Sequence, residues 1–232
     1  AYIHFYELSP DGKTIVYGDR KNRLYSLDIA TAQKQLIAED SISRFYGVEF
    51  SPDSRWITYT RPARNNMSVV YLYDLRSRRE TAVTEDWYDS SAPAVSTDGK
   101  YLIFASARDF NPIYSYTEWN HAYTNMEGVY IALLSKGTPS PFLEKDDKVK
   151  VEAPKTDEPK KDDKKKTDKK AKKAAADENV TVIDIDGIGD RIIKLPLPSG
   201  NYGSFYCNGK KLWYNNGAEI SVFDFAKQKS ES

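Results

Sequence analysis

The chain has 232 residues with 40% hydrophobic and 13% aromatic content, which is typical of folded domains and excludes a wholly disordered protein. Its 34 Lys and Arg residues balance its 34 Asp and Glu residues, so no net positive field is present to recruit nucleic acid or an anionic membrane. The sequence has no apolar run long enough to cross a bilayer, and its one cysteine excludes an internal disulfide. We therefore expect neither nucleic-acid binding nor membrane insertion.

The first predicted element is a β-hairpin around the stretch SPDG, residues 9–12. In such a turn Pro10 presets φ, Asp11 tolerates the next position and Gly12 adopts the left-handed conformation. Alternating apolar residues on both sides of the turn predict two strands. Two further strands, over residues 24–30 and 33–39, complete a four-stranded unit.

The same pattern returns at residues 50–60 and 95–105, and in a degenerate form at 206–217. The first three turns are 42 and 45 residues apart, counted from one turn aspartate to the next. Ser54 replaces the glycine in the second copy, which predicts a strained or differently closed turn there. The equivalent turn residues are Asp11, Asp53, Asp98 and Asn208, and the third strands of three repeats end at Asp28, Asp74 and Asp224.

A repeat of forty-odd residues with four short strands and no helical stripe predicts the blades of a β-propeller. The predicted fold class is all-β: a partial propeller of about three blades plus the start of a fourth, whose last strand is missing or reduced to residues 227–232. Such an arc leaves two apolar blade faces uncovered, so it belongs to a longer propeller or pairs with a second copy. The chain is interpreted as a single segment, with repeats at about 1–40, 41–86, 87–202 and 203–232.

Two insertions interrupt the third repeat. Residues 106–127 form a long aromatic loop, which we expect to lie over a rim of the propeller, either covering a blade edge or facing a ligand or partner. Residues 144–178 contain no aromatic residue and are dominated by Lys, Asp and Glu, so we expect a solvated spacer. The residues predicted to contact a peptide or partner are Phe110, Tyr114, Tyr116, Trp119, His121 and Tyr123.

No catalytic, cofactor or metal site is predicted. The two histidines are His4, which is interpreted as a packed or edge residue of a predicted strand, and His121, for which a pairing with the distant Cys207 is conceivable. The stretch at 187–191 lacks the third glycine of a dinucleotide fingerprint, and 184–187 lacks the later ligands of a calcium loop. We interpret both stretches as a strand and a turn at the outer edge of the third blade.

The chain resembles a known family in two long segments, residues 107–142 and 182–202, which flank the charged spacer. Together with the repeats, which lack a Trp-Asp pair at the end of the third strand, they are similar to the propeller region of bacterial tricorn-like serine peptidases. The resemblance implies a WD40-like propeller within a hydrolase, with further blades, a PDZ-like module and a serine peptidase core as neighbours. It implies that this segment is noncatalytic and admits or presents peptides or unfolded polypeptide.

Two alternatives remain open from the sequence. One is a TolB-like protein-interaction propeller without protease activity, and the other is the propeller of a dipeptidyl-peptidase-type α/β-hydrolase. The resemblance implies a cytoplasmic location by analogy with tricorn, and a periplasmic one under the TolB-like alternative. The residues themselves leave the compartment, the blade number, the oligomeric state and the peptide preference open.

Overall fold

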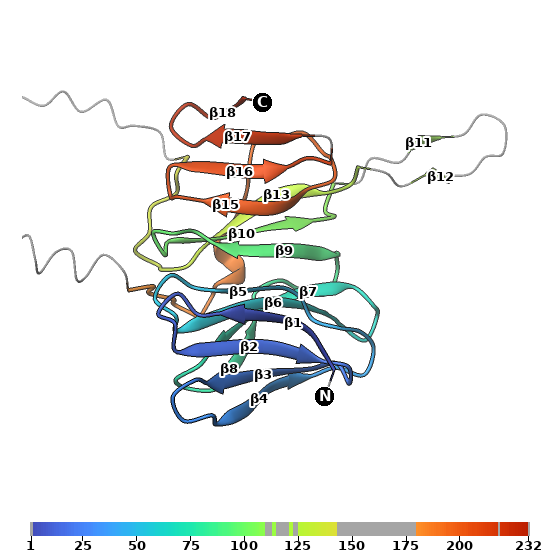
Figure 1. The fold of residues 1–232 in the computed structure, drawn as a ribbon. Coiled ribbons are helices and arrows are strands. Elements are labelled where there is room, and N and C mark those ends of the chain that lie inside the picture. The colour runs from blue at the N-terminus through green and yellow to red at the C-terminus, as the bar shows by residue number, and fades with distance from the viewer. Residues whose placement is uncertain are drawn as a thin grey trace, which may run out of the picture.

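The structure is a computed structural model that describes residues 2–109, 113–114, 121–122, 125–142, 180–217 and 219–231, with the backbone alone at 113–114 and 121–122. Four four-stranded antiparallel sheets follow one another along the chain, and Figure 1 shows them stacked into an arc. We call them blades 1 to 4. Blade 1 holds β1 (Ile3–Leu8), β2 (Thr14–Asp19), β3 (Arg23–Asp28) and β4 (Lys34–Glu39); blade 2 holds β5 (Tyr46–Phe50), β6 (Trp56–Pro62), β7 (Ser68–Asp74) and β8 (Arg79–Ala82); blade 3 holds β9 (Ser90–Val95), β10 (Tyr101–Ser106), β13 (Gly128–Leu133) and β14 (Ile192–Lys194); blade 4 holds β15 (Gly203–Cys207), β16 (Lys211–Asn215), β17 (Ile220–Asp224) and β18 (Lys229–Glu231).

The blades pack face to face through three apolar clusters, one between each pair of neighbours. Blade 3 is covered on both sides, so every residue of β10 and β13 is buried. In blade 4 the burial alternates instead: Leu212 and Phe223 face blade 3 and are buried, whereas Tyr206 on the opposite face is exposed. This switch from continuous to alternating burial reflects how many faces of each sheet are covered.

The two outward faces of the arc are apolar and exposed. Tyr6, Leu8 and Leu36 lie on the free face of blade 1, and Tyr206 and Ile220 lie on that of blade 4. Each free face therefore has the character of a surface that another sheet normally covers.

The repeated turns share one hydrogen-bond pattern. In the first, the Ser9 hydroxyl donates to Asp11 Oδ1 at 2.6 Å and accepts from the Thr14 amide at 2.9 Å. The second and third turns repeat both bonds, with Ser51 and Ser96 in the serine position. Because these serines and aspartates satisfy one another and the backbone, the turn is structural, as its sequence predicts.

The second turn keeps this closure although it lacks the glycine. Ser54 has φ of 61°, close to the 70° of Gly12, so the predicted left-handed strain is present. The expectation of a different closure is wrong, because the Ser54 amide donates to Ser51 O at 2.9 Å, as the Gly12 amide does to Ser9 O. The Ser54 hydroxyl also accepts from the Asp11 amide at 3.0 Å, which links blade 1 to blade 2.

Blade 4 has a short fourth strand and a turn of its own. Its fourth strand is reduced to the three residues of β18, within the predicted range 227–232, and its pairing with β17 completes the four-stranded sheet. Its turn is closed differently, because Asn208 Oδ1 accepts from the amides of Lys210 and Lys211 at 3.0 and 2.8 Å. Asn208 here occupies the position of the serine in the other turns, because its amide donates to Lys211 O as the Ser9 amide does to Thr14 O.

The segment after the second insertion was predicted to form a strand, a turn and another strand. The last of these is β14, the outer edge of blade 3, as expected. Residues 181–185 are extended but belong to no sheet, and a single turn of 3₁₀ helix, η1 (Gly189–Arg191), follows them. Ile183 and Ile185 pack into the cluster between blades 2 and 3. Within the described residues no helix is long and apolar enough to cross a membrane.

Candidate functional site

The alternation of strand directions gives the arc two different ends. The SPDG-type turns lie at one, which we call the turn end, where the chain also leaves and rejoins the described structure around residues 143–179. The connections between blades lie at the other, which we call the loop end, where the 106–127 insertion departs from β10. Figure 1 shows the turn between β1 and β2 on the left and the strands β11 and β12 on the right.

Exposed aromatic and apolar side chains gather at the loop end, at the starts of the innermost strands, in the connections that lead to them and in the turn between β6 and β7. Trp87 is 76% exposed and Tyr46 is 61% exposed, values unusual for large side chains that serve only a core. We call this group the loop-end rim. It comprises Tyr2, Ile42, Tyr46, Met67, Trp87 and Tyr88.

Two adjoining hollows of about 580 and 400 Å³ lie beside the rim on blade 2. Both are lined by Ala63, Tyr71 and Asp86. Arg61 lines the smaller hollow, with its guanidinium 4.5 Å from the centre of the Tyr71 ring. This hollow thus combines an aromatic wall with a fixed cation.

Acidic and phenolic groups hold Arg61 in place. Its Nη2 is 2.7 Å from Glu80 Oε2, its Nη1 is 3.9 Å from Asp40, and Glu80 also accepts a hydrogen bond from the Tyr59 hydroxyl. Burial raises the pKa of Tyr59, and the Glu80 carboxylate raises it further, so this phenol stays protonated. The cluster is therefore a positioned ion pair rather than a source of a reactive base.

The root of the aromatic insertion is anchored to blade 3. The Asp109 amide donates to Met126 O at 3.0 Å, and its carboxylate accepts from Lys194 Nζ at 2.6 Å and Ser199 Oγ at 2.8 Å. The Arg108 guanidinium lies 5.9 Å from the centre of the Tyr88 ring, which ties this root to the rim.

The residues predicted to contact a ligand are only partly described. Tyr114 and His121 pair across the two-stranded sheet of β11 (Ile113–Tyr114) and β12 (His121–Ala122), which Figure 1 shows apart from the four blades. Phe110, Tyr116, Trp119 and Tyr123 lie outside the described residues, as does the charged run 144–178.

The rim residues were not predicted from the sequence, because most of them lie in connections between strands. The signal available was the pair Trp87 and Tyr88 within the polar stretch 85–90, where a buried strand is not expected.

No nucleophile or metal site is formed by the described side chains. Cys207 is buried, and desolvation raises the pKa of its thiol to about 12, so the reactive thiolate is disfavoured. His4 lies edge-to-face with Tyr2, with ring centres 4.9 Å apart. In the ranges that the structure describes, no three His, Cys, Asp or Glu side chains come together in a way that could hold a metal ion.

Four antiparallel sheets stacked through apolar faces around a shared inner edge define the chain as a β-propeller segment. The family model of the tricorn protease second β-propeller domain matches residues 1–232, and the chain belongs to this family. The chain is thus a propeller domain of a tricorn-like protease.

Individual relatives agree with this family. Tricorn protease homolog 1 of Streptomyces coelicolor is 27% identical over 84% of this chain and 17% of its own length. A putative tricorn-like protease C-terminal subunit of Sulfurisphaera tokodaii is 25% identical over 84% of this chain and 19% of its own length. The crystal structure of the tricorn protease superposes with a TM-score of 0.75 at 16% identity, covering 99% of this chain and 22% of that chain. The chain therefore spans about a fifth of the length of the relatives it matches.

Proposed function

We propose that this propeller domain admits or presents peptides to a serine peptidase core that lies in other parts of the parent protein, and that the loop-end rim makes the contacts. The observation that carries the proposal is the gathering of exposed aromatic side chains at one end of the arc. Peptides offer varied side chains and a constant backbone, and aromatic surfaces with a few polar groups accept many such sequences.

The rim also lies at the end from which the aromatic insertion departs. The predicted contact residues Tyr114, Tyr116, Trp119 and His121, with Phe110 and Tyr123, would then extend the same surface. The Arg108 contact with Tyr88 supports this arrangement, because it joins the root of the insertion to the rim.

The partners within the parent follow from the two free faces of the arc. Further propeller blades are the partners that suit the exposed Tyr6 and Leu36 of blade 1 and Tyr206 of blade 4, since these lie where a neighbouring blade packs. A second copy of the chain is the alternative occupant. A protein-interaction propeller without a peptidase is the alternative function, and it would use the same rim for a folded partner.

Matched substitutions at the two ends of the arc test this proposal. In the complete peptidase, Trp87→Ala is expected to lower kcat/KM for a long peptide by about fivefold to tenfold, because truncating an exposed aromatic anchor typically costs about 1 to 1.5 kcal/mol. Ile42→Ala should have a smaller effect in the same direction. A short chromogenic substrate that reaches the core without the rim should be turned over at the wild-type rate.

Ile29→Ala provides the control, because Ile29 is 46% exposed at the turn end and Ile42 is 51% exposed at the loop end. The proposal predicts that Ile29→Ala leaves both substrates unaffected. Equal losses for long and short substrates, or equal effects of the Ile29 and Ile42 substitutions, would show that the rim does not act on peptides.

A further inference from the structure

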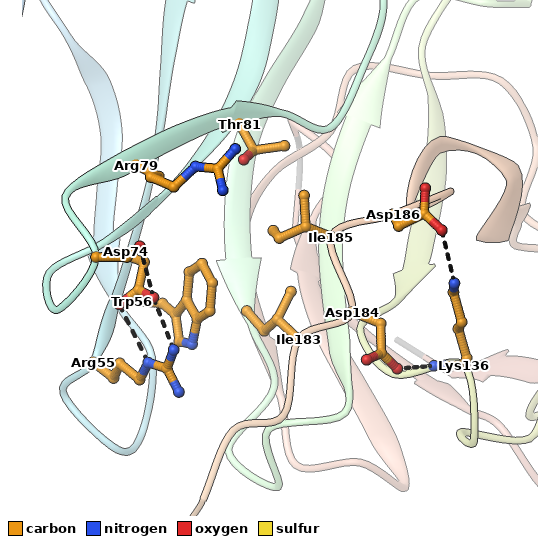
Figure 2. A pocket seen from close by; sticks show the side chains of 11 residues that line it. Arg55, Trp56, Asp74, Arg79, Thr81, Lys136, Ile183, Asp184, Ile185 and Asp186 are labelled. Carbon is orange, nitrogen blue, oxygen red and sulfur yellow. Dashed lines mark hydrogen bonds and ion pairs between the residues drawn. The ribbon is translucent and has the colours of Figure 1, made fainter.

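A separate hollow lies at the turn end, in the seam between blades 2 and 3. This groove has a volume of about 400 Å³, at the lower end of the range for small-ligand sites. Figure 2 shows its walls: Trp56 on one side and Ile183 with Ile185 on the other, with Arg79 and Thr81 of β8 above.

In the wall formed by residues 183–186, successive side chains of the extended chain point to opposite sides. Figure 2 shows Ile183 and Ile185 turned toward Trp56, and Asp184 and Asp186 turned toward Lys136. Asp184 Oδ2 accepts from the Lys136 amide at 2.7 Å, and Lys136 Nζ is 3.0 Å from Asp186 Oδ2. Asp186 is therefore paired with a cation, Asp184 accepts hydrogen bonds, and the apolar side of this segment faces the groove.

The opposite wall is also held rigidly. Arg55 makes two hydrogen bonds to the Asp74 carboxylate, at 3.2 and 2.8 Å, and its guanidinium lies 5.0 Å from the centre of the Trp56 ring. The Arg55 hydrogen bonds lower the pKa of Asp74 to about 2, so this pair is charged at neutral pH. Arg55 and Asp74 thus satisfy each other.

Two groups of the groove remain without a partner among the described residues. Trp56 is 5% exposed, yet its indole Nε1 makes no hydrogen bond in the part of the chain that the structure describes. Arg79 forms no ion pair with any described carboxylate, and Figure 2 shows its guanidinium free at the groove wall. A buried N–H donor without an acceptor is rare in native proteins and needs an explanation.

We propose that this groove binds a short peptide segment that carries an apolar side chain next to a carboxylate. The apolar side chain lies between Trp56 and the two isoleucines, the carboxylate pairs with Arg79, and a peptide carbonyl accepts from Trp56 Nε1. Charge complementarity selects this ligand, because Arg55 and Lys136 are already paired and Arg79 is the unpaired cation of the described lining. The carboxylate comes either from a peptide C-terminus or from an Asp or Glu side chain.

The indole N–H signals of the full chain, followed by ¹H–¹⁵N NMR, give a direct test. The Trp56 signal is identified by its loss in Trp56→Phe or, if that variant does not fold, by elimination with phenylalanine at each of the other three tryptophans. N-acetyl-leucine offers a terminal carboxylate, acetyl-leucyl-glutamate α-amide offers a side-chain carboxylate, and N-acetyl-leucinamide offers neither. At least one of the two carboxylate probes should shift the Trp56 signal saturably, and the neutral amide should do so only at about tenfold higher concentration.

Arg79→Gln should weaken binding of the active carboxylate probe by about tenfold, whereas Arg76→Gln removes the same charge from an exposed neighbour outside the groove and should leave binding unchanged. Binding of the terminal probe alone identifies a C-terminus as the ligand, and binding of the side-chain probe alone identifies an internal acidic residue. A Trp56 signal that responds to neither carboxylate probe, or equal weakening by both arginine substitutions, would overturn the proposal. Because the rim lies at the opposite end of the arc, failure here leaves the peptide-admitting function to be judged by the Trp87 and Ile42 variants.

Discussion

Phe223→Ala is expected to lower the free energy of unfolding of the chain by about 3 to 5 kcal/mol. Phe223 is fully buried on the face of β17 that packs against blade 3, and its ring lies 5.6 Å from that of Phe225 and 6.4 Å from that of Phe142. Removing the ring would leave a cavity in a cluster that two sheets build together, and neither sheet can close it alone. Urea unfolding followed by circular dichroism measures the change.

Tyr206→Ala is the matched control, because Tyr206 belongs to the same blade but lies on its free face and is 55% exposed. In the isolated chain this substitution should lower the free energy of unfolding by less than about 1 kcal/mol. If the two substitutions destabilised the chain equally, the assignment of one face of blade 4 to the core and the other to the outside would be wrong.

Glu49→Gln is expected to stabilise the chain above neutral pH. Glu49 lies on β5 beside the fully buried Thr58, and desolvation, with a contribution from Glu7, raises the pKa of its carboxyl from 4.5 to about 7. The folded state therefore binds a proton that the unfolded state has already released between these pH values. Stability from this group is fully present below about pH 4.5 and is lost as the pH rises through about 7.

The size of the effect is at most about 3 kcal/mol, because each unit of pKa difference corresponds to about 1.4 kcal/mol. Unfolding curves at about pH 4 and about pH 9 should show the Gln variant matching the wild type at the lower pH and exceeding it at the higher pH. Glu7→Gln, which removes only the neighbouring charge, should give a smaller gain. A wild-type stability that does not fall between the two pH values would mean that Glu49 is solvated in the folded chain.

The repeating units could be predicted from the sequence because each carries its own local signals. Asp28, Asp74 and Asp224 do end the third strands, and each carboxylate accepts amide hydrogen bonds from the turn that follows. These turn hydrogen bonds join residues that are neighbours in sequence, so such turns can be predicted without a structure. The alternation of buried and exposed residues in blade 4 is also a local pattern, because only one face of this sheet is covered.

The parts that were missed depend on contacts between distant segments. Apolar and polar residues alternate over 183–186 as they do in a strand. However, Ile183 and Ile185 pack into the seam between blades 2 and 3, and the strand that pairs with β13 is β14. Likewise, the groove exists only because Trp56 of blade 2 and Ile183 of this segment lie on opposite walls of it. Periodicity alone does not distinguish a paired strand from an extended segment packed in such a seam.

The central claim is that neighbouring sheets stack as propeller blades, and a double-mutant cycle across one seam tests it most directly. Tyr101 in blade 3 and Phe225, which directly follows β17, have ring centres 5.9 Å apart, and both are buried. The account predicts a coupling energy of about 0.5 to 1.5 kcal/mol between Tyr101→Ala and Phe225→Ala, and none between Tyr101→Ala and Trp213→Ala, whose ring pairs with Tyr206 on the free face. Additive effects for the first pair, or equal coupling in both, would contradict the stacking of these sheets.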